Sequence, residues 1–331
     1  MVTGGAGYIG AHTSRLLLER GDEVFIVDDL VTGFAERVPG VPLLQIDLAD
    51  PTSRQPLTEF FRRHSIDAVI HFAARKQVAE SVARPAWYYQ QNVGGLAQLL
   101  MAMEDAGVGK LVFSSSAAVY GAADGAIDEA HDTRPVSPYG ATKLAGEQLI
   151  ESSSRAWNLS AVSLRYFNVG GAGWPELGDT ETSNLIPIVQ HELESGRPPQ
   201  IFGNDYPTPD GTCLRDYIHV LDVAEAHLAV LDTLPVEAGH RALNVGTGIG
   251  TSVLEIVSRI IAVAGSDLVP VSRPRRAGDA AAVVALVERI ANETGWQARF
   301  SLEDIIESSW ASQQHFRTLS PTAGFPRTVG S

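Results

Sequence analysis

The 331-residue sequence contains a single cysteine, Cys213, and far fewer basic than acidic residues. One cysteine cannot form an intramolecular disulfide, which favours a reducing compartment. Lys and Arg number 25 against 39 Asp and Glu, for a formal net charge of -14, so the positive excess that nucleic acids and anionic membranes attract is missing. Any anionic substrate must therefore be held by a few local arginines.

Long apolar runs and metal-ligand spacings are also missing. No run is long enough to span a bilayer, and nothing before the first glycine motif resembles a signal peptide, so we expect a cytoplasmic protein. Because the first strand has only about three residues, we expect the natural chain to begin slightly upstream. The nine histidines show no spacing such as His-Glu-x-x-His, so we predict no metal and interpret His71 and His219 as packing residues.

The first half of the chain alternates short apolar runs with longer amphipathic stretches, a pattern typical of repeated strand and helix units. It predicts an α/β fold of the Rossmann type, with a doubly wound parallel sheet covered by helices on both faces. The expected strands span residues 1–3, 23–28, 42–46, 68–72, 110–114 and 161–166, and the expected helices span 8–20, 52–64, 85–106, 139–156 and 220–232.

Beyond about Asn168 the order loosens, because glycine- and proline-rich loops at 170–178 and 197–211 separate isolated helices. We expect residues 1–168 to form the Rossmann domain, to which some later segments return. Residues 169–318 are expected to form a smaller α/β region that mainly binds substrate, and residues 319–331 a disordered tail.

A glycine motif, Gly4-Gly5-Ala6-Gly7-Tyr8-Ile9-Gly10, lies between a short strand and an apolar-periodic helix. Glycines there let the backbone approach a pyrophosphate at a helix N-terminus. Asp28 ends the next strand, where a dinucleotide-binding fold places the carboxylate that binds the adenosine ribose. That carboxylate would repel a 2′-phosphate, so NAD is favoured over NADP. A structural turn is the alternative for the glycines, and the start of a polar loop is the alternative for Asp28 and Asp29.

Tyr139 and Lys143 lie four residues apart and so share one face of a helix. A phenol titrates near pH ~10, and its use as a base at neutral pH requires a shift of roughly three units, or about 4 kcal/mol. Lys143 and a positive nicotinamide ring are the expected sources of this shift. Ser116 comes directly after a strand end and is expected to bond the same substrate oxygen. The alternatives are a surface pair of side chains and serines that cap a loop.

Several motifs together resemble the extended short-chain dehydrogenase/reductases and, among them, the UDP-glucose 4-epimerase family, from residue 1 to about residue 315. In addition to the glycine motif, four segments and one pair of residues carry the resemblance: His71-Phe72-Ala73-Ala74, Phe113-Ser114-Ser115-Ser116, Tyr139 with Lys143, Leu164-Arg165-Tyr166-Phe167-Asn168 and Arg215-Asp216-Tyr217-Ile218-His219-Val220. The early motifs are shared by many sugar-nucleotide enzymes. The stretch from Ile201 to Thr208, together with Arg215 to His219, is more specific to the epimerases.

The resemblance implies a catalytic set, an NAD site and a UDP-sugar site. The catalytic residues would be Tyr139, Lys143 and Ser116. NAD would be bound by Gly4, Gly7, Tyr8, Ile9, Gly10, Asp28, Asp29, Leu30, Val31, Thr32, Gly33, Asp47, Leu48, Phe72, Ala73, Ala74, Arg75, Lys76, Asn92, Ser116, Tyr139, Lys143 and Phe167, with Asp47 on the adenine. The UDP-hexose would be bound by Ser116, Tyr139, Asn168, Asn184, Leu185, Arg215, Arg276, Asp279 and Val283, with the arginines on the diphosphate and Asp279 on the uridine ribose. Without the resemblance, Arg215 is a surface ion-pair partner, and Arg275 and Arg276 are a solvated loop pair.

The reaction implied is inversion at C4 of UDP-glucose and UDP-galactose. Tyr139 would take the 4-hydroxyl proton while hydride passes to NAD, and hydride return to the other face of the keto sugar would invert C4. A 4,6-dehydratase is the main alternative, but Ala117 and Ala118 after Ser116 supply neither an acid nor a base. A non-catalytic dinucleotide sensor is disfavoured because it would need neither Tyr139 nor Lys143.

The resemblance also implies substrate breadth and a homodimer. Bulky aromatic residues at the position of Val283 narrow the sugar pocket in some family members, so valine implies activity on UDP-N-acetylglucosamine and UDP-N-acetylgalactosamine as well. Dimers of the family pair two long helices, here about 85–106 and 139–156. Apolar residues recur at helical spacing in the first of these, a pattern that a buried core face also produces: Leu96, Leu99, Leu100 and Met103.

Overall fold

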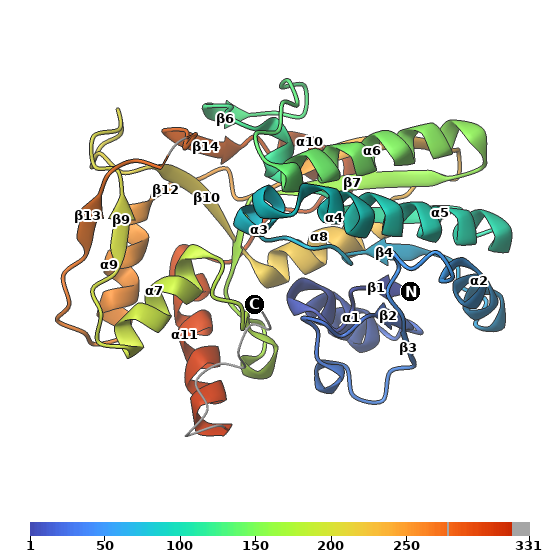
Figure 1. Ribbon diagram of the computed structural model, residues 1–331, viewed down its shortest axis with the longest axis horizontal. Helices are drawn as coiled ribbons and strands as arrows, with labels where there is room; N and C mark the ends of the chain where they lie inside the picture. The colour runs from blue at the N-terminus through green and yellow to red at the C-terminus, as the bar shows by residue number, and fades with distance from the viewer. Residues whose placement is uncertain (277, 320–331) are drawn as a thin grey trace.

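The computed structural model describes residues 1–276 and 278–319. A seven-stranded parallel sheet forms the centre of the larger part of the molecule (Figure 1). Every neighbouring pair in this sheet is parallel, and the order runs outward in both directions from β1. The predicted doubly wound Rossmann fold is therefore confirmed. In spatial order the strands are β3 (Leu43–Gln45), β2 (Ile26–Asp28), β1 (Val2–Thr3), β4 (Val69–His71), β5 (Lys110–Ser114), β7 (Ser160–Tyr166) and β11 (Gly239–Val245).

All six predicted strands lie in this sheet, but most are shorter than expected. The strand expected over 23–28, for example, is β2 over Ile26–Asp28. The seventh strand, β11, was not predicted, because its sequence GHRALNV lacks the dense apolar run that marks the others. It pairs with β7 over its whole length and closes that edge of the sheet.

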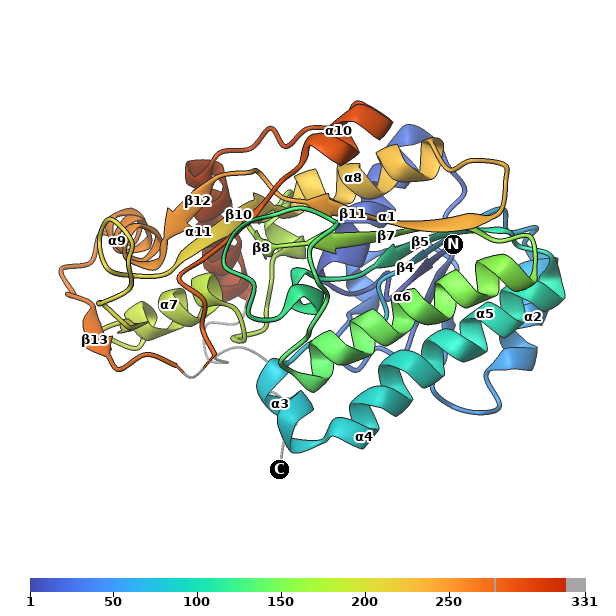
Figure 2. The same ribbon diagram turned by 90° about the horizontal axis from the view of Figure 1, so that it is seen from above.

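Helices cover both faces of the sheet (Figure 2). α1 (Tyr8–Arg20) and α8 (Val220–Asp232) lie on one face, and α5 (Gly95–Ala106) and α6 (Pro138–Ala156) lie on the other, with α2 (Arg54–Arg63) packed against α5. Successive residues of a strand point to opposite faces, so Val112 joins the core beneath α1 and α8 while Leu111 joins the core beneath α5. The sheet is thus buried on both sides, and its edges become the accessible places.

The helix expected over 85–106 is interrupted. It consists of α4 (Pro85–Tyr88), a π-helical turn η2 (Tyr89–Gly94) and α5. The turn brings Gly95 against Leu48, where a Cβ atom on the glycine would lie 3.3 Å from the leucine Cβ. The apolar stripe of α5 is buried in the core of this chain, so it gives no evidence for a subunit interface: Leu96, Leu99, Leu100 and Met103.

The smaller part contains two further sheets. One has the order β12 (Gly250–Ser252), β10 (Leu214–His219), β14 (Ala282–Ala285) and β6 (Gly125–Ile127), with β8 (Asn168–Gly170) beside β10. The other pairs β13 (Val271–Arg273) with β9 (Gln200–Phe202), so the expectation of a plain loop over 197–211 was wrong. β6 comes from the first half of the chain, which ties the two parts together.

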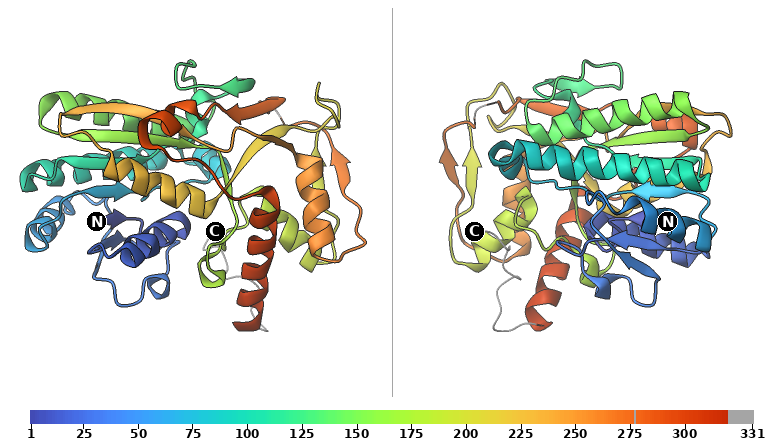
Figure 3. Two further views of the ribbon diagram at one scale, coloured as in Figure 1. Left: turned by 180° about the vertical axis from the view of Figure 1, so that it is seen from behind. Right: turned by 45° about the vertical axis from the view of Figure 1, so that its right-hand side comes forward.

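The remaining helices surround these sheets. They are α7 (Leu185–Glu194), α9 (Val253–Val263), α11 (Leu302–Leu319), α10 (Glu288–Thr294), α3 (Val78–Ala83) and the short turns η1 (Ala35–Arg37), η3 (Ala117–Tyr120) and η4 (Pro175–Leu177). The expected loop over 170–178 therefore includes a helical turn. Figure 3 shows α11 running beside α9, and the two helices pack together.

The predicted tail begins one residue too early, because Leu319 is the last residue of α11; its other residues, 320–331, lie outside the described residues. Over residues 1–276 and 278–319, no helix combines the length and the apolar character needed to cross a membrane.

Candidate active site

The residues proposed to bind NAD gather at one edge of the seven-stranded sheet. Parallel strands all present their carboxyl ends at the same edge, which is where open α/β sheets bind ligands. Six candidate segments lie at those ends: Gly4–Gly10 after β1, Asp28–Gly33 at the end of β2, Asp47–Leu48 after β3, Phe72–Lys76 after β4, Ser116 after β5 and Phe167 after β7. Asn92, Tyr139 and Lys143 come from η2 and α6.

The glycine motif forms a tight cradle at the start of α1. Gly4 has a φ of +66°, and a Cβ atom there would lie 2.6 Å from the backbone nitrogen of Ala73. A Cβ atom on Gly10 would lie 2.1 Å from the Gly4 carbonyl oxygen. Gly7 is the N-cap of α1 and offers no side chain to the first helical N–H groups. The backbone here fits a pyrophosphate, because both the close approach and the helix N-terminus are available.

Asp28 connects the loops on either side of this cradle. One carboxylate oxygen accepts the N–H of Ala6 at 3.0 Å and the other accepts the N–H of Leu30 at 2.9 Å. The side chain is buried, and this burial raises its pKa above the usual range. A carboxylate has about four lone-pair sites, so Asp28 keeps acceptor capacity for a ribose hydroxyl while fixing the loops.

A chain of polar contacts runs along the edge from Asp29 to Asp47. Arg75 pairs with the Asp29 carboxylate at 2.5 Å, and its Nε donates to Gln91 Oε1 at 3.1 Å. The Gln91 amide in turn donates to Asp47 at 3.3 Å. Asn92, which is buried, accepts the N–H of Arg75 and donates to its carbonyl oxygen. Gln91 was missed by the sequence analysis, since nothing but its position next to Asn92 marked it.

Tyr139, Lys143 and Ser116 meet beside this edge. α6 begins at Pro138, and Ser137 caps it by accepting the N–H of Gly140. Lys143, one turn further on, lies 6.0 Å from the centre of the Tyr139 ring and donates to the Ser114 carbonyl oxygen at 2.7 Å. The structure thus places Lys143 beside Tyr139, and Ser116 lies close enough to Tyr139 to influence its pKa through a hydrogen bond.

Burial shifts the pKa of both Tyr139 and Lys143. Burial raises the pKa of Tyr139 above 10, while a hydrogen bond with Ser116 and the positive charge of Lys76 oppose that rise. Burial also lowers the pKa of Lys143 to about 7, against the influence of Glu147. Burial thus favours the neutral form of both side chains.

A buried network holds the strand end that carries the serines. Ser115 Oγ donates to Glu147 at 2.5 Å, and Glu147 forms a two-pronged ion pair with Arg165 at 3.0 and 2.6 Å. Arg165 also donates to the Tyr120 hydroxyl, which donates to Asn244 Oδ1 at 2.7 Å. Arg165 belonged to a motif of the sequence, but its partners lie far from it in sequence and were not predicted.

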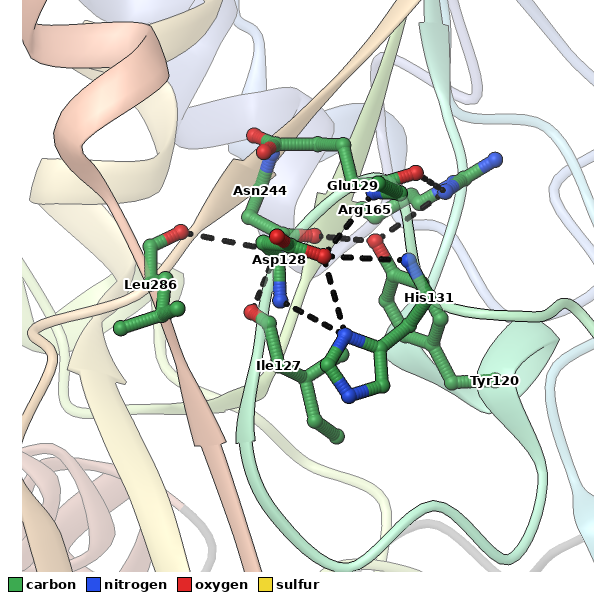
Figure 4. A network of polar contacts seen from close by, with 9 residues as sticks. Tyr120, Ile127, Asp128, Glu129, His131, Arg165, Asn244 and Leu286 are labelled. Carbon is green, nitrogen blue, oxygen red and sulfur yellow. Dashed lines mark hydrogen bonds and ion pairs between the residues drawn. The ribbon is translucent and has the colours of Figure 1, made fainter.

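The same network reaches the smaller part of the molecule (Figure 4). Asn244 donates to the carbonyl oxygen of Ile127 at 2.9 Å, at the end of β6, and its N–H donates to Glu129 at 2.7 Å. A weaker contact joins it to the carbonyl oxygen of Leu286, just after β14. Both strands belong to the second sheet, so the network couples the serine strand to the proposed sugar-binding side.

Four of the predicted substrate residues gather around β10. Arg215 lies on β10 and pairs in register with Val283 on β14. Its guanidinium donates to the carbonyl oxygen of Ala280 at 3.0 Å and lies 3.7 Å from the Asp279 carboxylate. Asn168 donates to the backbone of Asp216, also on β10.

Besides Ser116 and Tyr139, three more predicted substrate residues lie on neighbouring segments. The Arg276 guanidinium lies 3.9 Å from the centre of the Phe202 ring on β9. Asn184 is the N-cap of α7, which starts at Leu185, and it donates to Asp179 at 2.8 Å. Phe202 was not among the predicted site residues, although it lies within the epimerase-specific stretch from Ile201 to Thr208.

The two histidines that were interpreted as packing residues, His71 and His219, are both buried. His71 is buried, bonds Thr3 at 2.6 Å and stacks on Phe113, while His219 caps α8 and stacks on Phe300. In the part of the chain that the structure describes, no group of three or more His, Cys, Asp or Glu side chains could hold a metal ion.

Comparison with known proteins agrees with this geometry. Residues 1–246 match the model of the NAD dependent epimerase/dehydratase family. A UDP-glucose 4-epimerase of Halalkalibacterium halodurans is 43% identical over 94% of this chain and 94% of its own length. The crystal structure of a UDP-glucose-4-epimerase from Stenotrophomonas maltophila, with bound NAD and formylated UDP-arabinopyranose, matches with a TM-score of 0.90 and 40% identity over 96% of this chain and 98% of that chain. A UDP-Glc/GlcNAc 4-epimerase from Campylobacter jejuni matches with a TM-score of 0.83 and 36% identity over 95% of this chain and 98% of that chain. The chain belongs to the NAD dependent epimerase/dehydratase family and, within it, to the UDP-glucose 4-epimerases.

Proposed function

We propose that the protein is an NAD-dependent isomerase that interconverts UDP-glucose and UDP-galactose in cytoplasmic carbohydrate metabolism. The observation that carries the proposal is the meeting of Tyr139, Lys143 and Ser116 beside the glycine cradle. The relatives compared above, between 36% and 43% identical to this chain, are UDP-glucose 4-epimerases and a UDP-Glc/GlcNAc 4-epimerase. Ala117 and Ala118 after Ser116 supply neither the acid nor the base that a dehydratase needs.

The mechanism begins with proton transfer at the sugar 4-hydroxyl. Ser116 hydrogen-bonds the oxygen and Tyr139 accepts the proton; when bound, NAD takes up the C4 hydride and later returns it. Burial raises the pKa of Tyr139, so the residue needs a positive charge beside it to act as a base. Burial lowers the pKa of Lys143 and so limits the positive charge that it can supply there. The cationic nicotinamide ring of bound NAD would add positive charge there and so favour deprotonation of Tyr139.

The NAD-holding residues would divide into two groups. The cradle from Gly4 to Gly10 would hold the pyrophosphate through backbone N–H groups, and Asp28 and Asp47 would hold the adenosine. Lys76 is a further positive charge that acts on Tyr139, although it is paired with Glu181 at 2.9 Å. In this division residues 1–168 mainly bind the cofactor and residues 169–318 mainly bind the substrate.

The nucleotide-sugar would be anchored at its diphosphate while the keto sugar turns. Arg215 and Arg276 are the proposed cations, Asp279 the ribose acceptor, and Asn168, Asn184 and Leu185 further contacts. In a protein with a net charge of -14, such a site must be built from individual arginines. Anchoring one end of the substrate leaves the other free to present either face of C4.

Two finer features are proposed with this function. Val283 leaves room for an acetamido group, and the similar Campylobacter jejuni structure is of a UDP-Glc/GlcNAc 4-epimerase. The protein is also proposed to form a homodimer through the outer faces of α5 and α6, which lie side by side on the surface of the larger part (Figure 2). A monomeric mass in solution at micromolar concentration would contradict the dimer.

Incubation with UDP-galactose tests the function directly. The expected product is UDP-glucose without net consumption of NAD, because the hydride is returned in each turnover. Accumulation of a 4-keto-6-deoxy sugar would indicate a dehydratase instead. Absence of any reaction with NAD still bound would indicate a dinucleotide sensor.

A further inference from the structure

An ion pair crosses the carboxyl edge of the sheet above the glycine cradle. Asp29 lies just after β2 and Arg75 just after β4, and these two strands flank β1, from which the cradle emerges. The Arg75 Nη2 lies 2.5 Å from Asp29 Oδ2, and the two side chains are only 15% and 22% exposed. A pair that is mostly shielded from water retains much of its attraction, unlike the fully solvated pairs of the surface.

The guanidinium of Arg75 is held from several directions. Its Nε donates to Gln91, and it lies 5.6 Å from the centre of the Trp87 ring. Its backbone is fixed on both sides by Asn92. Asp29 is held as well, since its other oxygen accepts the N–H of Val31 at 3.0 Å. The pair is therefore a built feature of the edge, with both partners fixed before any ligand binds.

The ion pair lies where a dinucleotide-binding fold distinguishes NAD from NADP. In dinucleotide-binding folds the ribose 2′-hydroxyl lies at the end of the second strand, and an arginine nearby accommodates a 2′-phosphate where NADP is used. Here an arginine stands at that edge, but its charge is compensated by Asp29. Asp28, the residue usually expected to choose the cofactor, accepts two backbone N–H groups and fixes the loops.

We propose that Asp29 sets the preference of this protein for NAD over NADP by holding Arg75 in an ion pair. While the pair is intact, a 2′-phosphate meets the carboxylates of Asp28 and Asp29 and finds no free guanidinium. Without the Asp29 charge, the planar fork of Arg75 is available to the phosphate, for which bidentate arginine contacts are well suited. The proposal rests on the NAD site of the proposed function but concerns the choice of cofactor rather than the reaction.

The test measures nucleotide retention, which does not depend on turnover. The full-length protein and its variants are incubated with excess NADP, separated from free nucleotide and denatured, and the NAD and NADP released are quantified. Asp29→Asn is expected to raise the ratio of retained NADP to NAD by about tenfold, the equivalent of ~1.4 kcal/mol. Arg75→Met should lower the ratio, because it leaves both carboxylates uncompensated. In the double variant Asp29→Asn/Arg75→Met, the ratio of retained NADP to NAD should rise much less than it does in Asp29→Asn.

A matched control is available on the surface. Arg54 and Asp105 form a two-pronged ion pair away from the cradle, and Asp105→Asn removes the same charge from the protein. It should leave the ratio unchanged. An unchanged ratio in Asp29→Asn would overturn the proposal, as would an equal gain in the double variant, since Arg75 would then play no part. Failure of the proposed NAD site would show differently, as absence of both nucleotides from the wild-type protein, and failure of the proposed reaction would show only in the assay with UDP-galactose.

Discussion

The catalytic end and the nucleotide-sugar end of the proposed site differ in what holds their side chains. At the catalytic end, Lys143 is buried and bonded to the Ser114 carbonyl, and Glu147 accepts three hydrogen bonds. At the sugar end, Arg276 lies on the face of Phe202, and Arg215 is 3.7 Å from a half-exposed Asp279. The chain alone thus orders the groups that move protons, whereas the groups proposed to hold the diphosphate keep their charges available for a ligand.

This difference fits the demands of the reaction. Proton transfer requires groups placed within hydrogen-bonding reach before the substrate arrives, and such preorganisation lowers the barrier most. A diphosphate anchor must instead exchange contacts with each binding event. A catalytic end built on the rigid seven-stranded sheet and a sugar end built on short strands and loops meet these two demands.

The largest expected effect comes from removing the proton acceptor at the ordered end. Tyr139→Phe should lower kcat by about 10²- to 10⁴-fold, the usual contribution of a positioned acid or base. Retained NAD should stay near the wild-type amount, because the change removes one hydroxyl from an otherwise intact site. The measurement is the rate of UDP-galactose conversion together with NAD content. Tyr89→Phe, at an exposed tyrosine of η2, serves as the control and should keep its rate. Near-normal turnover in Tyr139→Phe would remove this residue from the mechanism.

A second prediction tests whether the buried network is what orders that end. Glu147→Gln leaves the Arg165 guanidinium buried without its counter-charge, and breaking a buried pair in this way costs about 3 to 5 kcal/mol of unfolding free energy. Glu151→Gln is a matched control one turn further along α6, where Glu151 pairs with the exposed Arg155. That change should cost about 0.5 kcal/mol or less. Urea unfolding of both variants measures the difference, and equal losses would show that the network does not stabilise the ordered end.

The ordered end was also the more predictable one from sequence. The glycine motif, Asp28, and the spacing of Tyr139 and Lys143 are local patterns, and a parallel sheet necessarily gathers at one edge the loops that leave the carboxyl ends of its strands. The six strands of the first half were found because dense apolar runs mark strands buried on both faces. Each of these inferences depends on residues close together in the chain.

Contacts between distant segments could not be predicted. Glu147 and Arg165 lie on a helix and a strand whose meeting depends on the packed fold, and Arg75 reaches Asp29 across 46 positions of the chain. The strands of the smaller part, such as β9 and β13, have three residues each and too few apolar positions to show a period. The π-turn that sets Asn92 and Gln91 against Arg75 has no sequence pattern that distinguishes it from an ordinary helix.

A third prediction concerns acid, which should weaken the ordered part of the molecule through its buried histidines. Burial lowers the pKa of His12 and His71 to about 3 and that of His227 to about 4. Between these values and about 6.5, the unfolded chain binds more protons than the folded chain, so stability falls as the pH drops. Each such histidine removes about 1.4 kcal/mol per pH unit within its window.

His227 offers the cleanest test of this sign. It lies in α8 between Phe72 and Tyr166, and its Nδ1 bonds the Val223 carbonyl oxygen. In His227→Met, the slope of unfolding free energy between about pH 4.5 and 6 should be smaller than in the wild type by roughly 1 kcal/mol per unit. Because the comparison is between slopes, any constant loss from the substitution cancels. Parallel slopes for the two proteins in urea titrations would show that His227 is not the source of the acid sensitivity.

The smallest expected effect concerns the less ordered end, where Val283 is proposed to leave space for an acetylated sugar. Val283 pairs with Arg215 across β10 and β14, and it packs against the apolar cluster that contains Phe167 and Val119. That cluster adjoins the segment after Ser116, so a larger side chain at position 283 would extend toward the proposed sugar pocket.

The wild type should therefore convert UDP-N-acetylglucosamine as well as UDP-glucose. Val283→Tyr should lower kcat/KM for the acetylated sugar by about tenfold or more relative to UDP-glucose, while Val283→Ala should not, because steric exclusion of a few atoms costs about 1 to 3 kcal/mol. Parallel assays of the two substrates measure the ratio. A wild type confined to the non-acetylated sugars would show that another side chain closes the pocket, whereas equal losses on both substrates in Val283→Tyr would show that Val283 serves only the packing of β14.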